Sequence, residues 1–144
     1  MDKMKLIVFT TAGLLLVVGL ILSWAVYQQK DVAEQVGHLK SFTDENFEKE
    51  VVQASMKLPV LIDFYAEWCF PCKMLDPVLA EVAAEFKDQA VIGKLDTDKN
   101  LIARRFGVSK IPALFLIKDG EIKNAFYGVV PKETIVRALN EFGS

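Results

Sequence analysis

A Cys-x-x-Cys pair directly follows a strand-like apolar run, and this junction limits the folds open to the chain. Cys69 and Cys72 are the only cysteines among the 144 residues. They come after an apolar run over residues 58–65 that is interrupted only by Asp63, and an apolar helical pattern then extends to about Lys87. Because the run does not alternate, we expect a central strand that is buried on both faces.

Strand-like and helix-like segments alternate through residues 41–144. The expected elements are a short strand ending near residue 43, a helix at 44–54, a strand at 58–65, a helix to 87, a strand at 90–96, a helix at 98–106, strands at 113–118 and 121–128, and a helix from 131. Asp119-Gly120 predicts a two-residue hairpin turn, and Pro77 predicts a kinked helix. This order predicts an α/β fold with a mixed sheet and helices on both faces.

An uncharged apolar stretch precedes this domain. Residues 6–27 are long enough, as a helix, to span a hydrocarbon core of about 30 Å. We therefore expect an N-terminal transmembrane anchor over residues 1–27, a polar linker over 28–40 and a globular domain over 41–144. A cleaved signal peptide is the alternative, because small residues flank Trp24 at the two positions that a signal peptidase reads.

The few charges around the apolar stretch predict its orientation. Lys3 and Lys5 precede it, which favours an N-terminus in the cytoplasm and a globular domain on the periplasmic, or extracytoplasmic, side of the cytoplasmic membrane. A cleaved signal would export the domain as well. The net charge of −2 and the lack of a basic cluster disfavour a nucleic-acid partner. We expect a monomer.

The position of Cys69 and Cys72 predicts a chemical role for each sulfur. At a helix start, free N–H groups and the helix dipole stabilise an anion, so Cys69 should have a lowered thiol pKa and act as the nucleophile. Cys72, nearly one turn later, should be more buried and act as the resolving thiol. The Cys69 thiolate attacks a disulfide, a mixed disulfide forms, and Cys72 releases the reduced substrate. Pro71 suits the helix start because it lacks an N–H that would be unpaired there.

Three other interpretations of the cysteine pair remain open. A purely structural disulfide is disfavoured, because closing so short a loop contributes only about 2 kcal/mol to the stability of the fold. A zinc site needs four ligands, and the chain adds only His38, in the linker, to the two sulfurs. A copper(I) carrier that uses both thiolates is the stronger rival.

Residues 60–74, VLIDFYAEWCFPCKM, resemble the active-site segment of the thioredoxin family, and the resemblance extends over residues 41–142. It does not cover the apolar N-terminal stretch. The resemblance implies the thioredoxin fold, a five-stranded mixed sheet flanked by four helices. It also implies a protein-disulfide reductase whose redox centre is the cysteine pair, with neither an organic cofactor nor a metal.

The resemblance gives two charged residues a role beside the cysteines. Asp63 matches the family's buried acid, which exchanges a proton with Cys72. The apolar neighbours of Asp63 in sequence support this role, because desolvation should raise the pKa of a carboxyl in an apolar strand. The alternative is an Asp on an edge strand that faces water. Lys94 matches the family lysine near that acid, and a solvated strand lysine is its alternative.

Further positions match the family's substrate groove. Ile111-Pro112 matches the cis-proline loop that faces the cysteines, where backbone groups of Ile111 would pair with an extended substrate segment. Trp68 and Gly128 match groove-lining positions, although Trp68 could instead be a packing aromatic. Pro77 matches the helix-kink proline.

Two residues depart from the family pattern. Phe70, next to Pro71, stands where thioredoxin has Gly, and its ring should change the surface that a partner meets and the reduction potential. Tyr65 replaces a Trp that usually packs near the active site.

Reduction of protein disulfides is the expected direction, because Asp63, Lys94 and Ile111 follow thioredoxin more closely than its oxidising relatives. A thiol oxidase or isomerase running in the opposite direction is the alternative. A reductase outside the membrane needs electrons, so we expect a membrane-embedded dithiol donor. The clients of the reductase would be apocytochromes awaiting haem, as in cytochrome maturation, or mispaired exported proteins.

Overall fold

The computed structural model describes residues 15–26 and 38–143 of the chain, which divides into two compact units, residues 1–34 and 35–144. In the first unit, residues 15–26 are helical and their side chains are exposed. Within the described residues, no helix combines the length and apolar character needed to cross a membrane. The predicted anchor, residues 1–27, and the predicted linker, residues 28–40, lie largely outside the described residues.

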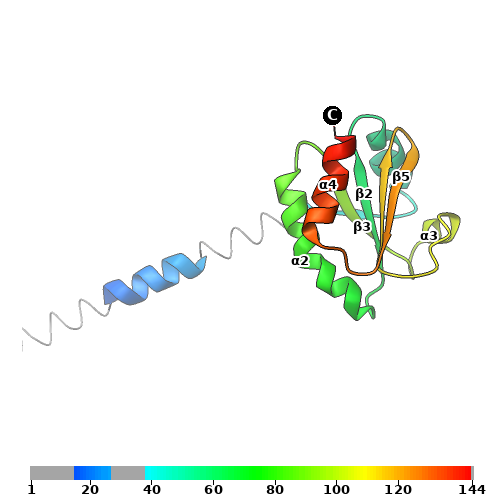
Figure 1. The fold of residues 1–144 in the computed structure, drawn as a ribbon. Helices are drawn as coiled ribbons and strands as arrows, with labels where there is room; N and C mark the ends of the chain where they lie inside the picture. Colours follow the sequence, from blue (N-terminus) through cyan, green and yellow to red (C-terminus); the bar gives the residue numbers. More distant parts are fainter. Residues whose placement is uncertain (1–14, 27–37, 144) are drawn as a thin grey trace, which may run out of the picture. The chain divides into compact units, whose positions relative to one another are not determined.

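The second unit is built on a five-stranded sheet (Figure 1). Its strands are β1 (Lys40–Phe42), β2 (Val60–Tyr65), β3 (Val91–Asp96), β4 (Ala113–Lys118) and β5 (Glu121–Tyr127). Their order across the sheet is β1-β3-β2-β4-β5, with β1, β3 and β2 parallel and β4 and β5 antiparallel to their neighbours. The prediction of an α/β fold with a mixed sheet is confirmed, and β2 lies at its centre.

The helices differ in detail from the expected ones. They are η1 (Glu48–Gln53), α2 (Phe70–Glu85), α3 (Ile102–Arg105) and α4 (Lys132–Phe142). The helix predicted over 44–54 is present, but its helical residues begin only at Phe47, and Glu48–Gln53 have π-helical hydrogen bonding. The predicted helix over 98–106 is only four residues long. Pro77 lies inside α2, as expected.

A side chain from a distant segment explains the short α3. The carboxylate of Asp44 accepts hydrogen bonds from the backbone N–H groups of Leu101 and Ile102, at 2.8 and 3.0 Å. Before that point, the backbone carbonyl of Asp96 accepts a hydrogen bond from the side chain of Asn100. The two bonds to Asp44 satisfy backbone N–H groups that an additional N-terminal turn would otherwise pair, so the helix can begin at Ile102.

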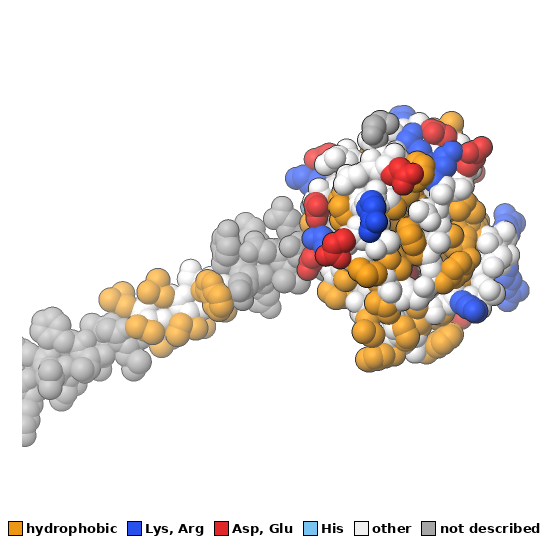
Figure 2. All heavy atoms as spheres, viewed as in Figure 1, with side chains coloured by type: hydrophobic (Ala, Val, Ile, Leu, Met, Phe, Trp, Pro, Cys, Tyr) orange, Lys and Arg blue, Asp and Glu red, His pale blue; other side chains and the backbone are white. Residues whose placement is uncertain are grey.

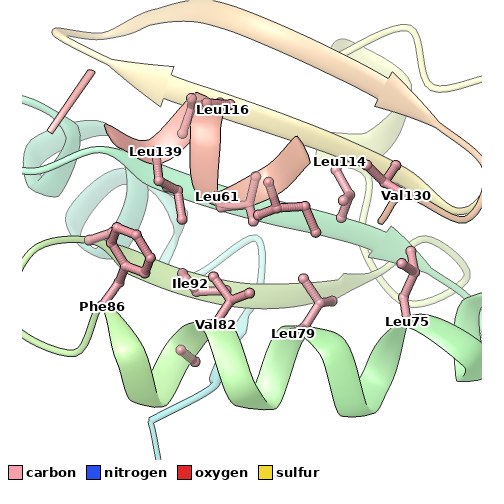
Figure 3. Packing of buried hydrophobic residues seen from close by; sticks show 14 residues of the cluster. Leu61, Leu75, Leu79, Val82, Phe86, Ile92, Leu114, Leu116, Val130 and Leu139 are labelled. Atoms are coloured by element: carbon pink, nitrogen blue, oxygen red, sulfur yellow. The ribbon is translucent and has the colours of Figure 1, made fainter. Parts of the chain in front are cut away.

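Two apolar clusters fill the space on either side of the sheet. The cluster between the sheet and α2 and α4 includes Leu61, Leu75, Leu79, Ile92, Leu114 and Leu139 (Figure 3). The cluster on the opposite face, with η1 and α3, includes Phe42, Val51, Ile62, Phe64, Ala103 and Phe115. Alternate residues of β2 enter different clusters, so this strand is buried on both faces as its unbroken apolar sequence predicts.

The hairpin between β4 and β5 also follows the sequence. Asp119 and Gly120 have positive φ angles of 56° and 74°, which the two-residue turn requires. The first strand of the hairpin, β4, pairs antiparallel with β2, which brings the start of β4 to the same end of the sheet as the start of α2.

Candidate functional site

The cysteine pair lies where β2 ends and α2 begins, as predicted. Cys69 is the N-cap residue of α2, with an extended backbone at φ −80° and ψ 102°, and Pro71 occupies the first turn. The sulfur of Cys69 accepts a hydrogen bond of 3.3 Å from the backbone N–H of Cys72. The helix therefore directs one of its free donors at this sulfur, where a thiolate would gain most from it.

The structure contains the oxidised form of the pair. Cys69 and Cys72 form a disulfide, with their Cα atoms 5.3 Å apart. Both residues are buried, at 3% and 1% exposure, so the expected contrast in burial is slight in this form. They pack against Ala66, Tyr65 and Ile111. Among residues 15–26 and 38–143, no cluster of three or more His, Cys, Asp or Glu side chains could hold a metal ion.

Asp63 is a fully buried acid in the central strand. It has 0% exposure, and neither carboxyl oxygen has a hydrogen-bond partner. Side chains alternate along a strand, so Asp63 shares the face of Leu61, the face that α2 covers. Burial raises its pKa to about 7, the field of Lys94 opposes this rise, and the field of Asp76 adds to it. The alternative of an edge-strand Asp facing water was wrong.

Lys94 lies beside Asp63 in the sheet but bonds elsewhere. The two residues are partners in the parallel register of β2 and β3. The Lys94 ammonium nevertheless forms an ion pair with the carboxylate of Asp76 on α2, and lies 4.0 Å from the centroid of the Tyr65 ring. Its side chain is 18% exposed, so the alternative of a freely solvated lysine was wrong.

A hollow of about 260 Å³ opens beside these charged groups. It is lined by Tyr65, Ala66, Glu67, Lys73, Asp76 and Lys94. The sequence patterns predict no role for Asp76, although the residue stands four positions after Cys72 in the predicted helix. That spacing places it one turn further along the same side of α2, and this was the available signal.

The loop before β4 forms a second wall of the site. The Ile111–Pro112 peptide bond is cis, and the Ile111 side chain packs on the cysteines. The carbonyl of Pro112 accepts a 2.8 Å hydrogen bond from the N–H of Gly128, which has a φ of 83°. Within the described residues, no hydrogen bond uses the backbone N–H or C=O of Ile111. These two groups are available to a bound segment.

Exposed apolar side chains flank the cysteines in sequence. Trp68 and Phe70 are 72% and 73% exposed, and Met74 and Tyr127 are also exposed. Figure 2 shows apolar side chains at the end of the globular unit where α2 begins. The indole N–H of Trp68 donates a 2.8 Å hydrogen bond to the carboxylate of Asp98. Such exposure does not fit the alternative in which Trp68 is only a packing aromatic.

Comparison with known proteins places this site in a large group of related chains. The family model Thioredoxin matches residues 38–141. The chain is 41% identical to thioredoxin 1 of Synechococcus elongatus over 100 residues, which cover 69% of this chain and 92% of that protein. It is 42% identical over 101 residues to thioredoxin of Pyropia yezoensis, with the same shares, and 38% identical over 100 residues to the chloroplastic M-type thioredoxin of Chlamydomonas reinhardtii, covering 69% of this chain and 70% of that one.

Proposed function

The chain belongs to the thioredoxin family and is a thioredoxin-like disulfide reductase with an active-site cysteine pair, and from this premise we propose that it reduces protein disulfides on the extracytoplasmic side of a membrane to which it is tethered. The observation that carries the chemistry is the hydrogen bond from the Cys72 N–H to the Cys69 sulfur. The observation that supports the tether is the uncharged apolar stretch over residues 6–27.

In the proposed cycle, each cysteine has one task. The Cys69 thiolate attacks one sulfur of the substrate disulfide, so a Cys69–substrate bond forms and the other substrate sulfur leaves as a thiolate. Cys72 then loses its proton and attacks Cys69. The Cys69–Cys72 bond forms, the second substrate sulfur leaves, and the substrate has gained the two electrons that the cysteine pair has lost.

Asp63 is the proposed proton acceptor for Cys72. Strand alternation directs its carboxyl at α2, the helix that carries Cys72 near its start. A pKa of about 7 allows this group both to accept and to donate a proton near neutral pH. Asp63 also lacks any hydrogen bond that would fix it in one protonation state.

The substrate segment is proposed to lie against the loop before β4. The free backbone N–H and C=O of Ile111 suit an extended chain that pairs as a short additional strand. Gly128 supports this wall through its bond to Pro112. The rings of Trp68 and Phe70 then contact residues that flank the client's disulfide.

The N-terminal stretch is proposed to hold the enzyme at the cytoplasmic membrane. Apolar side chains are exposed all along the described helical residues 15–26, including Leu16, Leu20 and Trp24, and lipid would cover them. Tethering would raise the concentration of the domain near a membrane-embedded dithiol donor, the proposed source of electrons. The proposed clients are apocytochromes awaiting haem and mispaired exported proteins.

Turnover of a model substrate tests the reductase. The full-length protein in detergent should reduce insulin in the presence of dithiothreitol, Cys69→Ser should abolish this activity, and Ser41→Ala, an unrelated change, should preserve it. An unchanged rate in Cys69→Ser would refute the cycle.

Membrane fractionation tests the location separately. The protein should remain in carbonate-washed membranes, and protease added to intact spheroplasts should digest its globular domain. Release by carbonate, or protection of the domain from protease, would refute the proposed tether or orientation without affecting the chemistry.

A further inference from the structure

A charged triplet lies on the α2 side of the sheet, and only two of its members are paired. Asp63 on β2 and Lys94 on β3 are register partners in neighbouring parallel strands. Lys94 is nevertheless bonded to Asp76, while both oxygens of the fully buried Asp63 lack a hydrogen-bond partner. A lysine that pairs with a buried acid favours the ionised form of that acid. Here the cation is held by a different residue.

Two groups hold the Lys94 ammonium where it is. The carboxylate of Asp76 supplies an opposite charge, and the face of the Tyr65 ring lies 4.0 Å from the nitrogen. A cation over an aromatic face is attracted by the ring's quadrupole. Asp76 is 44% exposed at the hollow beside α2, so solvent stabilises its charge more readily than that of Asp63. The lysine therefore pairs with the carboxylate that is less costly to ionise.

We propose that Asp76 is a positioning residue that, together with the Tyr65 ring, holds the Lys94 ammonium away from Asp63 and thereby keeps the buried carboxyl able to take the proton of Cys72. This inference rests on the proposed function and deepens it. Asp76 itself touches neither substrate nor the reacting sulfurs. It acts through Lys94 on the proton acceptor.

The step in question is the resolution of the mixed disulfide. The Cys72 thiol gives its proton to the Asp63 carboxylate, and the resulting thiolate attacks the sulfur of Cys69. A Cys69–Cys72 bond forms, the bond between Cys69 and the client breaks, and the client sulfur leaves with the electron pair. When the dithiol donor later reduces the disulfide, the donor loses two electrons, and Asp63 returns the proton to Cys72.

The charges around Asp63 explain why the position of Lys94 matters. Lys94 faces it from β3, and Asp76 acts on it from α2. Lys73 and Glu67 line the same hollow as Asp76 and Lys94. Burial raises the pKa of Asp63, Lys94 lowers it, and Asp76 raises it. If Lys94 paired with Asp63 directly, the carboxyl would become a weaker base for a thiol proton.

Removing the charge of Asp76 tests this inference. The pKa of Asp63 is measured in the oxidised full-length protein by following the carbon-13 NMR chemical shift of its carboxyl group as a function of pH. Asp76→Asn keeps the shape of the side chain and should lower that pKa by about one unit or more, because Lys94 is freed to approach Asp63. Asp76→Glu should restore the wild-type value. Glu81→Gln removes another carboxylate of α2, one that forms an ion pair with Lys132 of α4, and should leave the pKa of Asp63 unchanged.

A second pair of variants removes the lysine. In a Lys94→Met background, Asp76→Asn should lower the pKa of Asp63 by less than it does in the wild type, because no cation remains to be redirected. An equal decrease in both backgrounds would overturn the inference. So would an unchanged Asp63 titration in a folded Asp76→Asn protein.

These readouts separate the inference from the proposed function. The titration is measured in the oxidised protein and requires no turnover. If the wild type failed to reduce insulin, the proposed function would fail, while the titration would still decide whether Asp76 controls Asp63. If insulin reduction is observed, the acid limb of its pH–rate profile should shift to lower pH in Asp76→Asn and not in Glu81→Gln.

Discussion

The indole N–H of Trp68 donates a hydrogen bond of 2.8 Å to the carboxylate of Asp98, although the Trp68 side chain is largely exposed. The two residues belong to different loops, one before α2 and one after β3. The bond fixes the orientation of a large aromatic surface beside the cysteines. When a partner binds, an aromatic side chain that is already held in place loses less conformational entropy than a mobile one.

Loss of this bond should weaken the binding of protein substrates. Asp98→Ala should raise KM for insulin by about two- to tenfold, which corresponds to one hydrogen bond, and should leave kcat nearly unchanged. Asp98→Asn retains an acceptor oxygen and should remain close to wild type. An unchanged KM in Asp98→Ala would show that the indole needs no anchoring.

Asp63 should make the protein less stable as pH rises. Its pKa is 3.8 in an exposed state and about 7 in the folded protein, so the folded state binds more protons between these values. The free energy of unfolding therefore falls as pH rises from about 4 to about 7, by up to about 4 kcal/mol. Asp63→Asn should remove this decrease and be more stable than wild type above pH 7.

Denaturant unfolding of the oxidised protein at pH 5 and pH 8 measures this effect. The control is Asp88→Asn, which changes an exposed carboxylate and should follow the wild-type pH dependence. If Asp63→Asn lost as much stability as wild type between the two pH values, the buried acid would not titrate as described.

The Phe70 ring should contribute to binding and little to folding, because it is 73% exposed. Phe70→Gly should weaken binding of a client with apolar residues beside its disulfide by about five- to thirtyfold, the cost of about 1–2 kcal/mol of apolar contact. Phe70→Leu keeps apolar bulk and should lose less. Reduction of a small soluble disulfide should change little in both variants, and an equal loss there would contradict the assignment.

Gly93 is required where β1 meets β3. A Cβ atom at this position would lie 2.6 Å from a ring carbon of Phe42 and 2.7 Å from the backbone oxygen of Lys40. Gly93→Ala should therefore destabilise the protein by about 1–3 kcal/mol, measured by denaturant unfolding. In a Phe42→Leu background the same change should cost less, since a smaller side chain relieves part of the overlap. Equal costs in both backgrounds would contradict this.

Local sequence patterns predicted much of the fold and of the site. The unbroken apolar run predicted β2, and Asp119-Gly120 predicted the hairpin turn, because each depends on residues adjacent in sequence. The junction of β2 and α2 placed Cys69 at the helix start for the same reason. Family resemblance added the cis bond before Pro112, which few X–Pro bonds adopt.

Long-range contacts account for what the sequence did not predict. The late start of α3 depends on Asp44, which lies more than fifty residues earlier. The pairing of Lys94 with Asp76 depends on a choice between two carboxylates that only the folded packing determines. Periodicity within a segment carries no information about either contact.

Chemical trapping of the first intermediate identifies the nucleophilic sulfur. Reduced Cys72→Ser, incubated with a protein disulfide, should accumulate a mixed disulfide, and peptide mass mapping should place the client on Cys69. Reduced Cys69→Ser should accumulate almost none. If Cys69→Ser captured the client through Cys72 as readily, the sulfur at the start of α2 would not be the nucleophile, and the roles assigned to the two cysteines would be wrong.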